Sequence, residues 1–276
     1  MTSTPVNLIP TAGAPFQMPP TQAELPYDDN ENMETQRHKL QMELLIDALL
    51  PWLDAREDGY VGGNMFVYYS LAQVKNQDYK GPDVFVALDV PKGERLSWVS
   101  WEEGKTPDVV IELLSDSTAA KDKNEKKHIY QNKMHVPEYY WFDPFNPQDW
   151  AGFQLQGGHY QPIVPNAQGQ MVSQVLNLTL VQWQGTFKQV ETTWLRWAQL
   201  EGSILLTAAE QEYQRAAQEH QRAEQEYQRA EQERQRAEQA EAQIQQIARS
   251  LLQTGMPIAQ VAETTGLSIE RLQTLT

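Results

Sequence analysis

The chain contains no cysteine among its 276 residues. Disulfide bridges, thiolate zinc sites and cysteine nucleophiles are therefore excluded together. A long hydrophobic run is also missing: the most apolar window, residues 44–53, is short and contains Asp47, so it does not predict a membrane span. The N-terminus lacks the basic segment and apolar stretch of a secretory signal peptide. These absences predict a cytoplasmic protein that contacts no membrane.

Basic residues are scarce as well. The 22 Lys and Arg residues face 37 Asp and Glu residues, which gives a formal charge of -15. An acidic chain is repelled by phosphate backbones unless its basic residues are clustered. Composition therefore argues against a nucleic-acid partner, and a DNA-binding protein with this composition would need a local basic patch. The candidates for such a patch are Arg37, Lys39, Lys121, Lys123, Lys126, Lys127 and Lys133.

Composition divides the chain into four segments. Residues 1–32 are rich in Pro, Thr, Gln and Asn and poor in large apolar side chains, which predicts a disordered tail. Residues 33–200 carry enough apolar residues for the core of one mixed domain. Residues 207–247 repeat with a period of seven, and residues 248–276 regain an apolar pattern typical of short helices.

The segment 33–200 is typical of an α+β (α/β) fold. An apolar stripe over residues 34–53 predicts a first helix, and runs rich in β-branched and aromatic residues predict strands. Gly59 to Gly63 predict a turn, and the aromatic run over residues 64–70 predicts a strand after it. A lysine-rich helix is expected between Ser115 and Met134, because Pro137 prevents its continuation soon afterwards. A strand over 139–142 and a β-meander from Ala151 follow. We expect a mixed sheet flanked by helices.

Two acidic residues interrupt the most apolar predicted strand, residues 107–115. Side chains alternate along a strand, so Asp108 and Glu112 share one face, and Val109 and Ile111 share the other. A buried carboxylate costs several kcal/mol unless a cation or hydrogen-bond donors meet it. Glu112 therefore needs a partner, and a divalent metal is the obvious one.

A second strand with an acid at its start, Asp83, precedes this one along the chain. If the two strands are neighbours, Asp83 and Glu112 meet at one edge of a sheet, where their oxygens suit Mg²⁺ or Mn²⁺. The helix after Ser115 presents Asp122, Lys126 and Tyr130 at positions i, i+4 and i+8, on one face.

These motifs together resemble the Uma2 endonuclease-like family, which is similar to the PD-(D/E)xK restriction-endonuclease fold. The resemblance covers about residues 33–197. It depends on four motifs in order: Pro82-Asp83, Pro107-Asp108-Val-Val-Ile-Glu112-Leu-Leu-Ser115, Asp122-x-x-x-Lys126-x-x-x-Tyr130, and Val136-Pro137-Glu138-Tyr139-x-x-x-Asp143-Pro144.

The resemblance implies that Asp83 and Glu112 hold a divalent metal, with a lysine beside the attacking water. In the common pattern this lysine lies two residues after the acid of the strand, where this chain has Leu114. The family's variant moves the lysine to the following helix, and we assign it to Lys126. Lys121, Lys123 and Lys127 remain competing assignments. The roles of Asp108 and of Glu43, an acid on the first helix, stay open.

The seven-residue repeat over 207–247 predicts a long helix. Two sets of residues fit the a and d positions of a heptad: Tyr213, His220, Tyr227 and Arg234, and then Ala216, Ala223, Ala230 and Ala237. A seam of alanines and polar groups is weak, so a solitary charged helix stabilised by Glu/Arg pairs is nearly as good an interpretation. A homodimer through this helix or through the nuclease-like domain is an open alternative.

Residues 248–276 resemble a short helix-turn-helix. The segment that would contact DNA, 268–275, has a single basic residue, Arg271, and the acidic Glu270 is next to it. We therefore expect a packing or partner-docking unit. For the whole chain the favoured hypothesis is a metal-dependent DNA endonuclease that uses Asp83, Glu112 and Lys126. The alternative is a non-catalytic interaction protein that keeps the nuclease fold.

Overall fold

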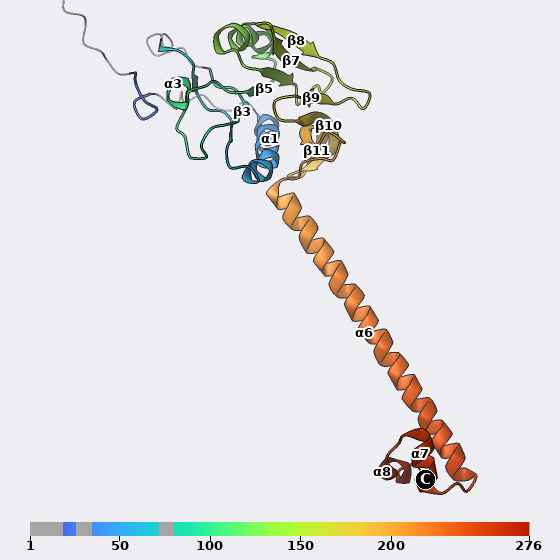
Figure 1. The fold of residues 1–276 in the computed structure, drawn as a ribbon. Coiled ribbons are helices and arrows are strands. Elements are labelled where there is room, and N and C mark those ends of the chain that lie inside the picture. Colours follow the sequence, from blue (N-terminus) through green and yellow to red (C-terminus); the bar gives the residue numbers. More distant parts are fainter. Residues whose placement is uncertain (1–18, 26–34, 72–79, 276) are drawn as a thin grey trace, which may run out of the picture. The chain divides into compact units, whose positions relative to one another are not determined.

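The computed structural model describes residues 19–25, 35–71 and 80–275, and two compact units divide the chain, residues 1–209 and 210–276 (Figure 1). The first unit is a mixed sheet with helices on it, which confirms the α+β fold class. Its six-stranded sheet has the order β1-β3-β5-β6-β7-β8. The strands are β1 (Tyr60–Gly62), β3 (Val84–Ala87), β5 (Val109–Leu113), β6 (Glu138–Phe142), β7 (Trp150–Gln156) and β8 (His159–Ile163).

The central pair β5 and β6 is parallel, and every other pair in this sheet is antiparallel. A parallel pair needs a long crossover connection. Here the crossover is a helical segment of four parts: α4 (Ala119–Lys121), η1 (Asp122–Lys126), α5 (Lys127–Ile129) and η2 (Tyr130–Met134). The two η parts are π-helical, and π-helical turns are frequent at functional sites.

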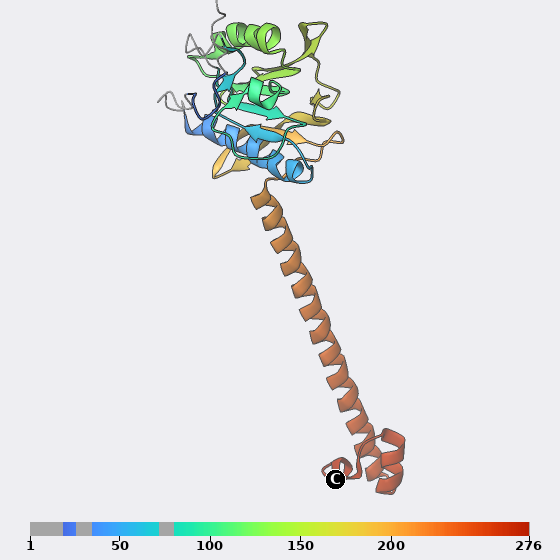
Figure 2. The same cartoon turned by 60° about the vertical axis from the view of Figure 1, so that its left-hand side comes forward.

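The helical crossover and the first helix α1 (Gln36–Asp54) cover opposite faces of the sheet (Figure 2). α1 begins where the Thr35 hydroxyl accepts a hydrogen bond from the His38 backbone N–H, 3.3 Å away. On the same face lies a three-stranded antiparallel sheet, made of β9 (Met171–Ser173), β10 (Leu178–Phe187) and β11 (Val190–Ala198). The six-stranded sheet is therefore buried on both faces.

The alternation predicted for β5 is confirmed by the two cores. Val109 and Ile111 pack in the core beneath α1, whereas Val110 packs with Tyr130 in the core beneath the helical crossover. Glu112 is therefore on the crossover side.

Three predictions near the N-terminus need correction. Most of the tail predicted over 1–32 lies outside the described residues, but Leu25 is buried against Phe66, Tyr68 and Val99, because apolar contacts offset the loss of chain entropy there. Residues 60–62, predicted to belong to a turn, form the edge strand β1. The strand expected over 64–70 shortens to β2 (Val67–Tyr68), which pairs with β4 (Trp98–Val99) ahead of the short helix α3 (Ser100–Glu103).

The second unit consists of the long helix α6 (Ala208–Gln253) and two short helices, α7 (Ile258–Thr265) and α8 (Ile269–Gln273). Ala248, Val261 and Leu272 form its small core. The boundary expected between 247 and 248 is absent, because α6 continues through it and Ala248 belongs to the core that α7 and α8 complete. In the described part of the chain, no helix combines the length and apolar character needed to cross a bilayer.

Candidate active site

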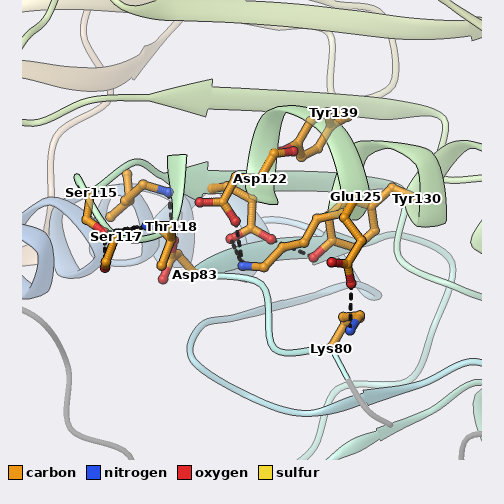
Figure 3. A network of polar contacts seen from close by, with 12 residues as sticks. Lys80, Asp83, Ser115, Ser117, Thr118, Asp122, Glu125, Tyr130 and Tyr139 are labelled. Atoms are coloured by element: carbon orange, nitrogen blue, oxygen red, sulfur yellow. Dashed lines mark hydrogen bonds and ion pairs between the residues drawn. The ribbon is translucent and has the colours of Figure 1, made fainter. Parts of the chain in front are cut away.

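Three acidic side chains and one lysine meet on the crossover side of the sheet (Figure 3). Asp83 directly precedes β3 and Glu112 lies near the end of β5. The antiparallel register pairs Val84 with Ile111, so the next residues outward, Asp83 and Glu112, are neighbours across the two strands. Asp122 comes from the first π-helical turn of the crossover.

Lys126 lies among these acids. Its Nζ is 3.1 Å from Glu112 Oε2 and 2.8 Å from Asp122 Oδ1. Glu112 is fully buried and Asp122 is 1% exposed, while the lysine side chain retains 15% exposure. The cluster is thus closed toward the sheet and reaches solvent through the lysine.

Neutral donors fix two further carboxylate oxygens and the backbone of the first π-helical turn. The Tyr130 hydroxyl donates to Glu112 Oε1 at 2.6 Å, and the Leu113 backbone N–H donates to Asp83 Oδ2 at 2.7 Å. The Tyr139 hydroxyl donates to the backbone carbonyl of Asp122 at 2.9 Å and so holds the π-helical turn against the sheet. The carboxylates are therefore oriented by groups whose own positions are set by packing.

The cluster carries an excess of negative charge. Burial raises the pKa of Glu112 to about 8; Lys126 opposes that shift, and the carboxylates of Asp83 and Asp122 add to it. Burial also raises the pKa of Asp83, although Lys126, the Leu113 N–H and a hydrogen bond with Glu112 oppose the shift. Burial lowers the pKa of Lys126, but the three carboxylates more than offset it, and the net shift is upward.

The donor set fits a divalent cation in type and in charge. Carboxylate oxygens are the ligands that Mg²⁺ and Mn²⁺ prefer. Three carboxylates around one ammonium leave up to two negative charges unbalanced, and a divalent cation would balance them. In the present arrangement, however, the oxygens converge on the amine of Lys126, and the described residues include no group of three acidic or histidine side chains arranged around one metal position.

Lys126 is the lysine that contacts the acids, as the assignment from the sequence expected. The three competing lysines lie elsewhere. Lys121 is exposed, Lys123 pairs with Asp149 at 2.5 Å, and Lys127 lies over the Phe153 ring, 3.3 Å from its centroid.

The two acids whose roles were left open have other partners. Asp108 Oδ2 accepts from Lys105 Nζ and from the Leu88 backbone N–H, both at 2.7 Å, at the opposite end of β5 from Glu112. Glu43 pairs on the surface with Lys188 at 2.7 Å. Neither is part of the acidic cluster.

Two members of the cluster were not predicted as site residues. The i, i+4, i+8 spacing placed Asp122 and Tyr130 on the face of Lys126, and this signal could have identified both. It did not reveal that Asp122 supplies a third buried carboxylate or that Tyr130 orients Glu112, because those contacts depend on the π-helical turns and on Tyr139 beneath them.

Fold and site together define a mixed α/β domain with a buried acid and lysine cluster at the edge of two adjacent strands. The chain belongs to the Uma2 family, described as "Putative restriction endonuclease", whose model matches residues 15–186. Residues 241–276 match a second model, described as the C-terminal HTH domain of the Rpn/YhgA-like nuclease family.

One solved structure that resembles the chain is that of a protein from Anabaena variabilis, described as a "putative nuclease belonging to DUF820". The two are 15% identical with a TM-score of 0.37, and the match covers 54% of this chain and 87% of that one. No protein of curated function matches the chain significantly.

Proposed function

We propose that this member of the Uma2 family is a metal-dependent DNA endonuclease that hydrolyses phosphodiester bonds at the cluster of Asp83, Glu112 and Lys126. The observation that carries the proposal is the burial of three acidic side chains around one lysine, more than that lysine balances when all three are ionised. A cluster with a purely structural role would not need this excess of acidic groups, because burial of unbalanced charge is costly.

Asp83 and Glu112 would hold the cation, Mg²⁺ or Mn²⁺. When bound, such a cation supplies a Lewis acid for the phosphate and an activated water. Tyr130 and the Leu113 N–H orient the two carboxylates, so that they need little reorganisation on binding. Lys126 offers its ammonium to the charge that develops on the phosphate, and its raised pKa keeps it protonated at neutral pH.

DNA is the proposed substrate. The family descriptions support a nuclease, and the exposed Lys121 and Lys133 lie on the same crossover as Lys126, so they can meet phosphates near the cluster. The formal charge of -15 makes DNA binding dependent on this local patch, and hence strongly dependent on salt.

The contacts of Lys126 favour one alternative. Because its amine pairs with both Glu112 and Asp122, the cluster can also be a closed ion-pair network in a non-catalytic interaction protein that keeps the nuclease fold. The two hypotheses differ in whether a divalent cation enters the cluster.

Cleavage of supercoiled plasmid DNA in Mg²⁺ or Mn²⁺ tests the proposal. We expect the native chain to cut and Asp83→Asn and Lys126→Ala to lose most of the activity. Glu43→Gln and Lys188→Ala remove the acid and the lysine of a surface ion pair outside the cluster, and both should cut like the native chain. Equal cutting by all five proteins would place the activity elsewhere, and no cutting under any metal would favour the non-catalytic alternative.

A further inference from the structure

An apolar stripe lies exposed on the C-terminal part of α6. Its members are spaced by three, four, three and four residues, which is the spacing of a helix that packs against another helix. Ile244 is 37% exposed and Ile247 is 54% exposed, which is unusual for isoleucine. We call this surface the isoleucine stripe, and it consists of Ala237, Ala240, Ile244, Ile247 and Leu251. Leu251, at its end, is half-buried because it also packs against the small core of its own unit.

The isoleucine stripe shares one of the two rows of the seam predicted from the heptads. The alanine row continues from Ala237 in steps of seven to Ile244 and Leu251, whereas the row of Tyr213 continues to Ala248. Ala248 is fully buried against Val261 and Leu272 of its own unit, so it has no surface left for another helix. A partner of α6 must therefore use a neighbouring face, and the isoleucine stripe is that face.

The surroundings of the stripe are shaped to receive a helix. A groove runs beside it and is lined by Ile247, Leu251 and the small or flexible polar side chains of Gln243, Gln246 and Ser250. α6 has 46 residues, and Ala248 is its one buried residue within the second unit. A helix this polar gains little from its own propensity and is stabilised mainly by packing or ion pairs.

The charged residues beside the stripe favour one orientation of a second α6 helix. Arg236 directly precedes Ala237, and Glu241 directly follows Ala240, so they occupy the g and e positions on either side of the stripe. In two parallel helices in register, g of one chain faces the following e of the other, which brings opposite charges together. In an antiparallel pair g faces g, so Arg236 would not meet Glu241. One heptad upstream the parallel register places Arg229 opposite Arg234, so the favourable pairing is confined to the stripe.

We propose that a second copy of this chain covers the isoleucine stripe, with the two α6 helices parallel and in register. By two-fold symmetry Arg236 of each copy then meets Glu241 of the other, twice per dimer. Glu241 also receives Arg271 of α8 in its own chain, which ties the C-terminal helices to the pairing surface. The proposal is independent of the nuclease activity.

The pairing is tightest toward the C-terminal end. Upstream the same face continues as alanines at one core position and glutamates at the other: Ala216, Ala223 and Ala230 with Glu219, Glu226 and Glu233. Glutamate at a core position destabilises a coiled coil, so the N-terminal part of α6 contributes less than residues 237–251.

Cysteine cross-linking of the full chain tests the orientation, because the native chain has no cysteine and an introduced one is unique. Under mild oxidation we expect Ala240→Cys and Ala230→Cys each to form a disulfide-linked dimer, since equivalent core positions adjoin in a parallel pair. Ala242→Cys, on the far face, is the matched control and should form no disulfide-linked dimer. Equal cross-linking at position 242, or none at positions 230 and 240, would overturn the proposal.

Sedimentation equilibrium of the full chain tests the interface itself. The native chain should show a mass twice its 31.6 kDa, and Ile247→Glu should return it to the monomer, because it buries a charge in the seam. Ala242→Glu adds the same charge on the far face and should remain a dimer. If far-UV circular dichroism shows that Ile247→Glu has lost helix, Ile244→Gln serves as the milder variant. A monomeric native chain would contradict the proposal. Ile247→Glu that keeps the mass of the dimer would contradict it as well.

Discussion

Two buried glutamates lie on neighbouring strands of the same sheet, and the side chains that surround them differ. Glu112 on β5 shares its site with two more acids and one lysine. Glu138 on β6 faces the opposite core and meets four hydrogen-bond donors and no cation. Its donors are the Tyr140 hydroxyl, the Ser173 hydroxyl and the backbone N–H groups of Gln174 and Val175, at 2.5 to 3.1 Å.

This difference separates a structural acid from a candidate catalytic one. Every donor of Glu138 belongs to β6, to the end of β9 or to the turn between β9 and β10, so the side chain fastens the second sheet to the first. Burial raises its pKa in spite of these donors, as it does for Glu112. Burial and a raised pKa are therefore common to both sites. The distinguishing feature of Glu112 is the accumulation of like charge around it.

The largest expected difference between the two glutamates is in catalysis. Glu112→Gln should lower plasmid cleavage by about 10²-fold or more, because the loss of a metal ligand removes several kcal/mol of transition-state stabilisation. Glu138→Gln, assayed at a temperature where it is folded, should keep its rate within a few fold. Similar losses in both variants would mean that the two sites do not differ in function.

Stability should show the opposite order. Glu138→Ala leaves four buried donors without their acceptor and should lower the free energy of unfolding by about 3 kcal/mol or more. Glu112→Gln should not lower it near pH 7, because native Glu112 has to take up a proton on folding at that pH, whereas the amide is neutral in both states. Urea denaturation measures both. A larger loss of unfolding free energy in Glu112→Gln than in Glu138→Ala would mean that Glu112, and not Glu138, is the structural acid.

The pH dependence sharpens the contrast. Glu112 has its ordinary pKa of 4.5 in the unfolded chain and about 8 in the folded chain, so the folded state binds the extra proton between these values. The contribution to stability is complete below pH 4.5 and is lost as the pH rises through 8. Compared with the native chain, Glu112→Gln should become relatively more stable as the pH rises from 5 to 9. A constant difference in urea denaturation across this range would contradict the raised pKa.

Much of the candidate site could be predicted from local patterns. Strand alternation placed Glu112 on the face opposite Val109 and Ile111, and the second acid at a strand's start identified Asp83. Helical spacing placed Lys126 on one face with Asp122 and Tyr130, and the family resemblance assigned Lys126 its role. The structure brings these residues together because each placement depends on the period of one element and on one pairing between adjacent strands.

Other features depend on contacts that a local pattern does not contain. The role of Asp122 needs the π-helical turn, and the four donors of Glu138 include three from residues 173–175, far along the chain. The edge strand β1 was predicted as a turn because of its glycines; it exists because β3 offers it a pairing partner. In the second unit, the repeat predicted a heptad helix that ends at residue 247, whereas α6 continues to Gln253 and α7 and α8 bury Ala248.

Binding of Mn²⁺ to the full chain, measured by isothermal titration calorimetry without DNA, tests the central claim most directly. The claim predicts saturable binding that Glu112→Gln and Asp83→Asn abolish and that Glu138→Gln leaves unchanged. Binding that persists in both cluster variants, or no binding by the native chain, would contradict it and leave Lys126 as the permanent counter-ion of a closed network.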